Sequence, residues 1–120
     1  MYTKCDKDAC PVAITMSLLA NKWSIRILHT LFIAQGNMLR FNEMRRALDN
    51  ITQRELSRQL KEFEQAGIIT RKVYPVVPPM VEYTLTPLGQ SLHEPIESLS
   101  KWAEQNGEQV KTNRLKNDKT

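Results

Sequence analysis

The segment from Thr52 to Gly67 limits the possible folds more than any other part of the sequence. It begins Thr-Gln-Arg-Glu, a spacing in which Thr52 and Glu55 satisfy each other's free backbone N–H groups at the start of a helix. Gly67 supplies the matching stop signal at the other end. Between these ends the apolar residues recur at helical spacing and form one stripe: Leu56, Leu60 and Phe63. We therefore expect an amphipathic helix with one buried side.

The hydrophobic period changes directly after Gly67. Residues 68–74 and 80–85 alternate as β-strands do, and the segment 75–79 between them, PVVPP, holds three prolines. Proline cannot donate to a sheet ladder, so these residues belong in the connection. A capped helix followed at once by a β-hairpin over 68–85 is the layout of a winged domain.

Helices are also expected on both sides of this unit. Pro11 opens an apolar segment as a first helical residue does, and the span 11–34 reads as two helices separated at Asn21. A short amphipathic helix follows, with Phe41, Met44 and Leu48 on its inner side. Thr86-Pro87 begins a last helix over 87–106, which Pro95 should bend.

Together these elements predict one domain over 1–120, mainly α with a small β-hairpin wing, in the α+β class. Residues 1–9 are expected to be a flexible arm, 40–66 the helix-turn-helix, 68–85 the wing, and 107–120 a polar tail. The expected architecture is a winged helix-turn-helix. Leu92, Ile96, Leu99 and Trp102 extend past what a small winged core could cover, which favours a homodimer.

The charge distribution indicates an anionic partner. Seventeen Lys and Arg against 13 Asp and Glu give a net charge of +4, and most of the excess lies between residues 36 and 74. On the capped helix, the polar residues lie opposite the apolar stripe. Arg54 stands in the first turn, where the helix dipole disfavours a cation by about a few tenths of a kcal/mol. A basic helix face of this kind fits the major groove of double-stranded DNA.

We assign expected contacts by position. Gln53, Arg54, Ser57 and Arg58 are expected near base edges, because recognition helices present their N-terminal residues there. Lys61 is expected on a phosphate, as are Arg40 and Asn42 at the start of the preceding helix, and the wing adds Arg71, Lys72 and Tyr74. The predicted DNA-binding set is Arg40, Asn42, Thr52, Gln53, Arg54, Ser57, Arg58, Lys61, Arg71, Lys72 and Tyr74. The alternative for these residues is a solvated helix face and a plain basic hairpin.

Several motifs in order resemble the HxlR-type transcriptional regulators, relatives of the MarR group, over about residues 10–104. They are Lys22-Trp23, RFNE at 40–43, TQREL at 52–56, Glu64 with Gly67, PPMVEY at 78–83 and LTPLG at 85–89. The family usually has glycine where this chain has Ala20-Asn21. The resemblance implies a homodimeric bacterial or archaeal regulator, dimerised through its first and last helices, that binds a roughly palindromic operator, with repression the expected outcome.

Cys5 and Cys10 are the only cysteines, too few to complete a tetrahedral zinc site within one chain. Cys10 precedes Pro11, and the start of a helix lowers the pKa of a thiol. The resemblance implies that a cysteine at this position can sense oxidants or electrophiles. One hypothesis is therefore a redox or electrophile switch at Cys10, with Cys5 as the candidate resolving partner. The alternative is an inert thiol packed at the dimer interface.

Other functional classes are disfavoured. His29 and His93 are isolated, no phosphate-binding loop occurs, and no enzyme, cofactor or metal site is expected. No apolar run approaches the ~20 residues of a membrane span, and the N-terminus lacks a signal-peptide core, so we expect a cytoplasmic protein with no membrane partner. Two alternatives remain: a winged-helix protein–protein interaction module, and the same regulator fold responding to a small molecule between the last helix and the DNA-binding core.

Overall fold

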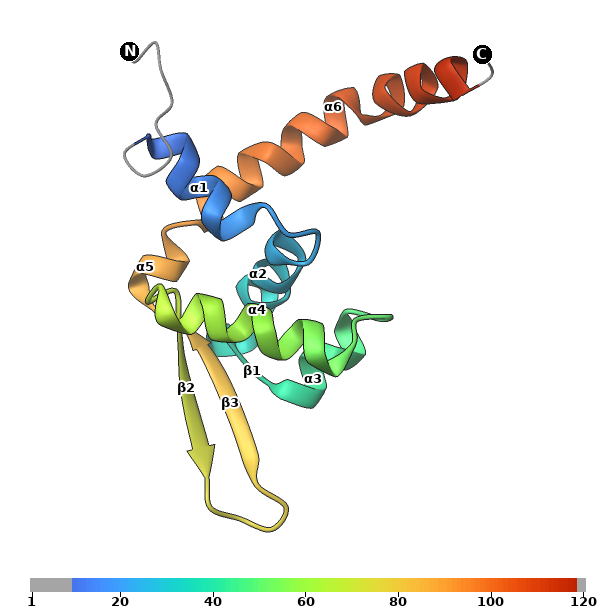
Figure 1. Ribbon diagram of the computed structural model, residues 1–120. Helices are drawn as coiled ribbons and strands as arrows, with labels where there is room; N and C mark the ends of the chain where they lie inside the picture. The colour runs from blue at the N-terminus through green and yellow to red at the C-terminus, as the bar shows by residue number, and fades with distance from the viewer. Residues whose placement is uncertain (1–9, 119–120) are drawn as a thin grey trace. The chain divides into compact units, whose positions relative to one another are not determined.

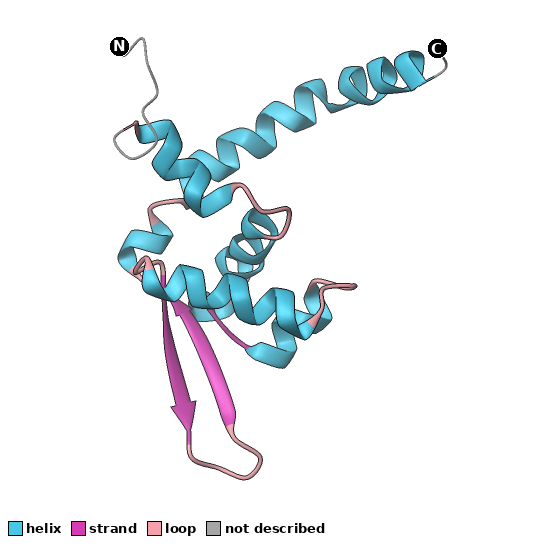
Figure 2. Ribbon diagram, in the orientation of Figure 1, coloured by secondary structure: helices cyan, strands magenta, loops and turns pink. Residues whose placement is uncertain are grey.

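A computed structural model describes residues 10–118 in two compact units, the first ending at Gln90 and the second beginning at Ser91 (Figure 1). Helices dominate both units, and a small sheet lies in the first (Figure 2). The predicted class, mainly α with a β-wing in a winged helix-turn-helix, is confirmed. Across residues 10–118 no helix is both long and apolar enough to cross a membrane.

The first two helices are where the sequence predicts them. Helix α1 (Pro11–Leu19) begins with proline at its first position after Cys10, and none of its residues is buried. Helix α2 (Ser24–Ile33) is amphipathic and buries Ile27, Leu28 and Leu31 completely. α2 therefore belongs to the core of the unit, whereas α1 leaves Val12, Ile14 and Met16 exposed.

A tight turn separates α2 from the next elements. The 3₁₀ turn η1 (Gln35–Asn37) contains Gly36 at φ 69° and Asn37 at φ 53°. The Asn37 side-chain amide donates to the carbonyls of Leu31 and Phe32, which satisfies acceptors at the end of α2. The chain then forms strand β1 (Met38–Arg40) and helix α3 (Phe41–Ala47), in which Met44 is buried.

Helix α4 (Gln53–Gln65) has both predicted ends. The backbone N–H of Glu55 donates to the Thr52 hydroxyl at 3.0 Å, and the Thr52 N–H donates to Glu55 Oε1 at 3.1 Å. At the other end, Gly67 has φ 77° and the Ile68 N–H donates to the Phe63 carbonyl, the pattern of a Schellman C-cap. The predicted stripe of Leu56, Leu60 and Phe63 is buried.

The sheet is larger than the hairpin expected from the sequence. Strands β2 (Ile69–Tyr74) and β3 (Met80–Leu85) pair antiparallel, but β1 pairs with the other edge of β3, giving the order β1-β3-β2. The register places Arg40 and Lys72 on either side of Glu82. A three-residue strand is too short for its alternation to be read from the sequence.

The C-terminal helix differs from its prediction in two respects. Instead of one helix over 87–106 bent at Pro95, there are α5 (Pro87–Gln90) and α6 (His93–Asp118), broken at 91–92. Pro95 lies in the first turn of α6, where its missing N–H leaves no helical hydrogen bond unmade. The expected end near residue 106 is also wrong, because α6 continues through most of the polar segment 107–120.

Gly89 allows α5 to pack closely against the backbone that follows α4. A Cβ atom at this position would lie 2.2 Å from the Ile68 carbonyl oxygen, so only glycine lets α5 approach that backbone. The Thr86 hydroxyl accepts from the Gly89 N–H at 3.0 Å and donates to the Gly67 carbonyl at 2.6 Å. Close packing therefore holds α5 against the end of α4.

Glu55 joins α2 to α4. Besides its cap on Thr52, its Oε2 accepts from the indole N–H of Trp23 at 2.7 Å. The Thr52 backbone N–H, the Trp23 indole and the Thr52 hydroxyl, with a smaller contribution from the charge of Lys22, hold the pKa of Glu55 below its usual value. One carboxylate thus caps α4 and fixes α2 to it.

This link predicts a pH-dependent loss of stability in Glu55→Gln. Because the folded-state pKa of Glu55 is lowered, its charge stabilises the fold fully above pH 4.5, and this stabilisation is lost as the pH falls below that value. Glu55→Gln should therefore melt at a lower temperature than the unmodified chain at neutral pH, and the gap should narrow below pH 4.5.

The matched control is Glu62→Gln on the same helix. Glu62 is exposed, and within the described residues its carboxylate makes no hydrogen bond or ion pair. The melting temperature of Glu62→Gln should therefore stay close to that of the unmodified chain. A gap for Glu55→Gln that stays constant across the whole pH range would contradict the role of the charge.

Candidate nucleic-acid interface

The outer side of α4 carries the polar residues expected to bind DNA. We call it the cationic face, and it comprises Gln53, Arg54, Ser57, Arg58 and Lys61, all exposed. It lies opposite the stripe that α4 buries in the core. The ion pairs within the described residues all lie in α6, so no carboxylate within 4.0 Å neutralises the cations of this face. A solvated helix that carries unneutralised guanidinium groups is suited to meet an anion.

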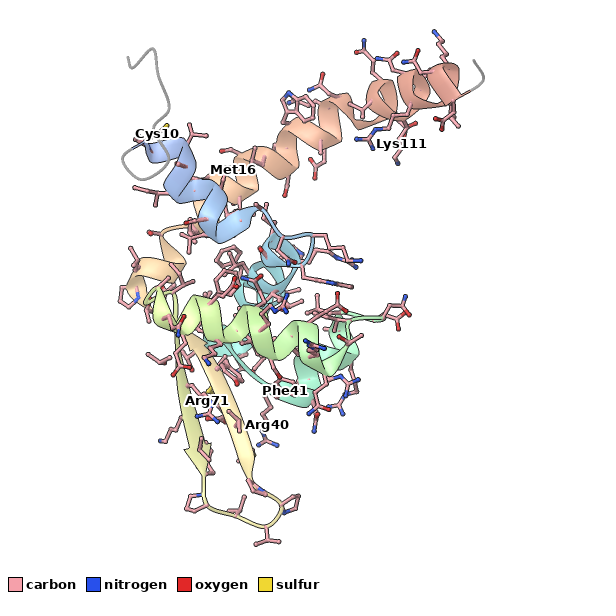
Figure 3. All side chains as sticks on the ribbon, viewed as in Figure 1. Cys10, Met16, Arg40, Phe41, Arg71 and Lys111 are labelled. Atoms are coloured by element: carbon pink, nitrogen blue, oxygen red, sulfur yellow. The ribbon has the colours of Figure 1, made fainter. Side chains whose placement is uncertain are left out.

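The start of α3 lies beside the wing loop. Arg40 is the last residue of β1 and the N-cap of α3, and its backbone N–H donates to Glu43 Oε1 at 2.8 Å. Figure 3 shows the Arg40 side chain close to β3, where the wing leaves the helices. Arg40 and Asn42 line a hollow of about 590 Å³ between α3 and the loop that joins β2 to β3.

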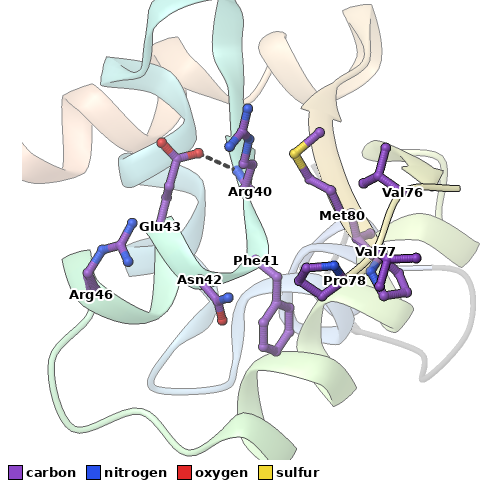
Figure 4. A pocket seen from close by; sticks show the side chains of 11 residues that line it. Arg40, Phe41, Asn42, Glu43, Arg46, Val76, Val77, Pro78 and Met80 are labelled. Atoms are coloured by element: carbon purple, nitrogen blue, oxygen red, sulfur yellow. Dashed lines mark hydrogen bonds between the residues drawn. The ribbon is translucent and has the colours of Figure 1, made fainter. Parts of the chain in front are cut away.

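The two walls of this hollow differ in chemistry (Figure 4). The α3 wall is mostly polar, since Glu43 and two arginines line it beside Phe41, and Arg46 lies one helical turn beyond Asn42. The loop wall consists of residues 76–81 and is mostly apolar, and Val77 at its tip is fully exposed. Arg46 was not among the residues predicted to bind DNA, although its i, i+4 spacing from Asn42 places both on one side of α3.

A second hollow continues the same surface toward the start of α4. It is lined by Asn42, Arg45, Arg46, Asp49, Asn50, Ile51, Thr52 and Gln53. Asn42 and Arg46 line both hollows, so the surface runs without interruption from the wing loop past α3 to the first turn of α4. The structure thus brings together the predicted residues of α3 and of the cationic face.

The two basic residues of the wing do not act as a pair. Successive residues of a strand point to opposite sides of the sheet. Lys72 shares a side with Glu82 and Arg40, whereas Arg71 lies opposite Tyr83 on the other side. Arg71 projects from β2 in Figure 3. A nucleic acid backbone that lies against one side of the wing would therefore meet only one of these two residues.

Tyr74 is held inside the wing. Its hydroxyl donates to Glu82 Oε1 at 2.7 Å, and Lys72 Nζ lies 4.9 Å from the centre of its ring. The hydroxyl proton of Tyr74 is therefore already used in a hydrogen bond to the neighbouring strand, and the oxygen can only accept a hydrogen bond from a partner. Its first role is to brace Lys72 and Glu82.

Cys10 stands at the N-cap of α1 and is buried, with 4% of its surface exposed. It is disulfide-bonded rather than a free thiol. Cys5, the candidate resolving partner, lies outside the described residues. Within residues 10–118 no cluster of three or more His, Cys, Asp or Glu side chains could hold a metal ion.

Known proteins are similar to this chain in sequence. Residues 18–111 match the model of the HxlR-like helix-turn-helix family. The chain is 41% identical over 103 residues to the HTH-type transcriptional regulator YdeP of Bacillus subtilis, covering 86% of this chain and 78% of YdeP. It is 40% identical over 102 residues to an HTH-type transcriptional regulator of Methanothermobacter thermautotrophicus, covering 85% and 76% of the two chains.

Among solved structures, the reduced form of the redox regulator HypR is similar, with a TM-score of 0.77 and 37% identity. That match covers 85% of this chain and 98% of HypR. The family model spans most of the chain, and relatives over 30% identical match it in both sequence and structure. The chain therefore belongs to the HxlR-like helix-turn-helix family of transcriptional regulators, which are not enzymes.

Proposed function

We propose that this transcriptional regulator binds double-stranded DNA as a homodimer at a palindromic operator and represses transcription. The observation that carries the proposal is the cationic face of α4, which is exposed, unneutralised and continuous with the surface that leads to the wing loop. The major groove admits one helix, and Arg, Gln and Ser side chains supply the donors that base edges and phosphates accept.

The contacts divide by position. Gln53, Arg54, Ser57 and Arg58 of α4 reach base edges, while Lys61 and the cap residue Thr52 lie toward the phosphates. Beside them Arg40, Asn42 and Arg46 hold one backbone strand at the hollow near the wing loop, whose apolar side contacts the sugars. Arg71 and Lys72 extend this grip along the adjacent groove.

Arg54→Ala and Arg58→Ala should each weaken binding to the operator. A guanidinium that contacts a base contributes about 1–3 kcal/mol, which corresponds to a loss of roughly 5- to 150-fold in affinity. Fluorescence anisotropy with a labelled operator duplex measures the change. Lys101→Ala is the matched control, because it removes the same charge from α6, where Lys101 pairs with Glu97. Equal affinities for all three variants and the unmodified chain would contradict the proposed role of α4.

Homodimerisation is supported by apolar side chains that a single chain leaves exposed. On α1, Val12, Ile14 and Met16 are each more than half exposed. On α6, Leu99, Trp102 and Leu115 are also more than half exposed. Exposed apolar surface on both helices favours burial against a second copy. A two-fold dimer would present two copies of α4 about one DNA turn apart, which matches a palindrome.

Met16→Glu and Trp102→Glu should each shift the protein toward monomer, because a carboxylate placed in an apolar interface must be desolvated. Sedimentation velocity measures the change, and circular dichroism verifies that each variant stays folded. Ser100→Glu adds the same charge at an exposed position of α6 and should remain dimeric. An unmodified chain that sediments as a monomer at concentrations that saturate the operator would overturn the dimer.

We further propose that the redox state of Cys10 controls DNA binding. Cys10 is the N-cap residue of α1, and α1 is one of the two helices proposed for the dimer. Two thiols that form a disulfide release two electrons and two protons to an oxidant, so the state of Cys10 can change without any cofactor. The similarity to HypR, a redox regulator known in reduced and oxidised forms, supports this proposal. An electrophile that alkylates the reduced thiol would act at the same atom.

Cys10→Ser should make operator affinity insensitive to oxidants and electrophiles. Affinity is measured for the reduced protein before and after treatment with diamide or with an α,β-unsaturated aldehyde. We expect the unmodified chain to change its affinity and Cys10→Ser to keep it. Identical responses of the two proteins would remove the switch and leave Cys10 a structural residue.

A further inference from the structure

Lys22 and Arg26 flank Trp23 at the start of α2. The Lys22 Nζ atom lies 5.3 Å from the centre of the indole ring, and the Arg26 guanidinium carbon lies 4.7 Å from it. Trp23 is buried, with 5% of its surface exposed, while Lys22 and Arg26 are exposed. Contact with the ring limits the freedom of both long side chains, so their charges stay in place before any partner arrives.

These cations lie beside the first turns of α4. The indole N–H of Trp23 reaches Glu55, and the charge of Lys22 acts on that same carboxylate. Next to them is a hollow of about 210 Å³ lined by Asn21, Arg54, Glu55, Arg58 and Gln59. The start of α2 therefore continues the cationic face of α4 on the side formed by Arg54 and Arg58.

The cluster keeps a net positive charge. Glu55 is the acidic side chain that lines this hollow, where its single charge faces several cations, and its two oxygens accept hydrogen bonds from the Thr52 N–H and the Trp23 indole. Among residues 10–118 no ion pair within 4.0 Å involves Lys22, Arg26, Arg54 or Arg58. Like charges held together repel one another, so an anion that spans the cluster gains binding energy from all of them.

We propose that Lys22 and Arg26 bind the phosphate backbone of the duplex whose groove α4 enters, an inference that rests on the proposed function. The cations spread from α2 to α4 instead of converging on one enclosed point, which suits a chain of phosphates better than a single small anion. Because Trp23 also holds Glu55 and hence the cap of α4, a phosphate at Lys22 and Arg26 fixes the position of α4 in the groove. Lys22 and Arg26 thus position α4 and read no sequence.

The test measures affinity against salt concentration for the full chain, with operator and unrelated duplexes. The double variant Lys22→Gln/Arg26→Gln keeps the aliphatic stems and removes both charges. The slope of log affinity against log salt is negative, and each lost phosphate contact makes it less steep by about 0.9. Affinity at physiological salt falls about fivefold per contact. We expect the same loss for both duplexes and an unchanged preference between them. Lys22→Arg/Arg26→Lys should restore the slope.

The outcomes separate this inference from the proposed function. An unchanged slope and affinity in the double variant, with Arg54→Ala still weakened for the operator, would overturn the phosphate contacts and leave the role of α4 intact. Loss of preference between duplexes would also overturn the inference, since it would indicate a base contact. If the unmodified chain binds neither duplex, both proposals fail. Inorganic phosphate at matched ionic strength that displaces DNA from the unmodified chain, but not from the double variant, would instead indicate a small-anion site.

Discussion

The hydrogen bond from the Trp23 indole to Glu55 is the interaction on which the arrangement of this surface depends. At 2.7 Å it joins residues 32 positions apart, and its acceptor is the carboxylate that caps α4. With the stripe of Leu56, Leu60 and Phe63 buried beneath it, α4 can neither rotate nor slide without losing the cap or the core contacts. The side of α4 that faces outward is thus decided by what the other side buries.

The charges on that outer side of α4 slightly destabilise the isolated helix. Arg54 stands at the end of α4 where the dipole disfavours a cation, and the neighbouring cations lack acidic partners within the described residues. The wing is built differently, because there Glu82 accepts from Tyr74 and lies across from both Lys72 and Arg40. Glu82 thus places a carboxylate among the cations of the sheet, whereas no described carboxylate lies within 4.0 Å of a cation on the cationic face of α4, as suits a protein that binds through that face.

Local signals in the sequence predicted the local features. The Thr52–Glu55 cap, the Gly67 stop, the buried stripe and the hairpin each depend on residues within a few positions of one another. Features that need distant partners were missed: strand β1, which exists because β3 offers it an edge, and the bond between Trp23 and Glu55. The polarity of residues 107–118 suggested a tail, but these residues continue α6, and pairs such as Lys111–Glu108 support the helix.

Selection of duplexes from a random library by the full-length chain tests the central claim most directly, because it presupposes no operator. If two copies of α4 enter successive major grooves, the enriched sequences should be inverted repeats whose half-site centres lie about one helical turn, roughly 10 base pairs, apart. Repeated rounds that enrich no common sequence, or that retain duplexes no better than a charge-matched protein of another fold, would contradict DNA recognition by α4.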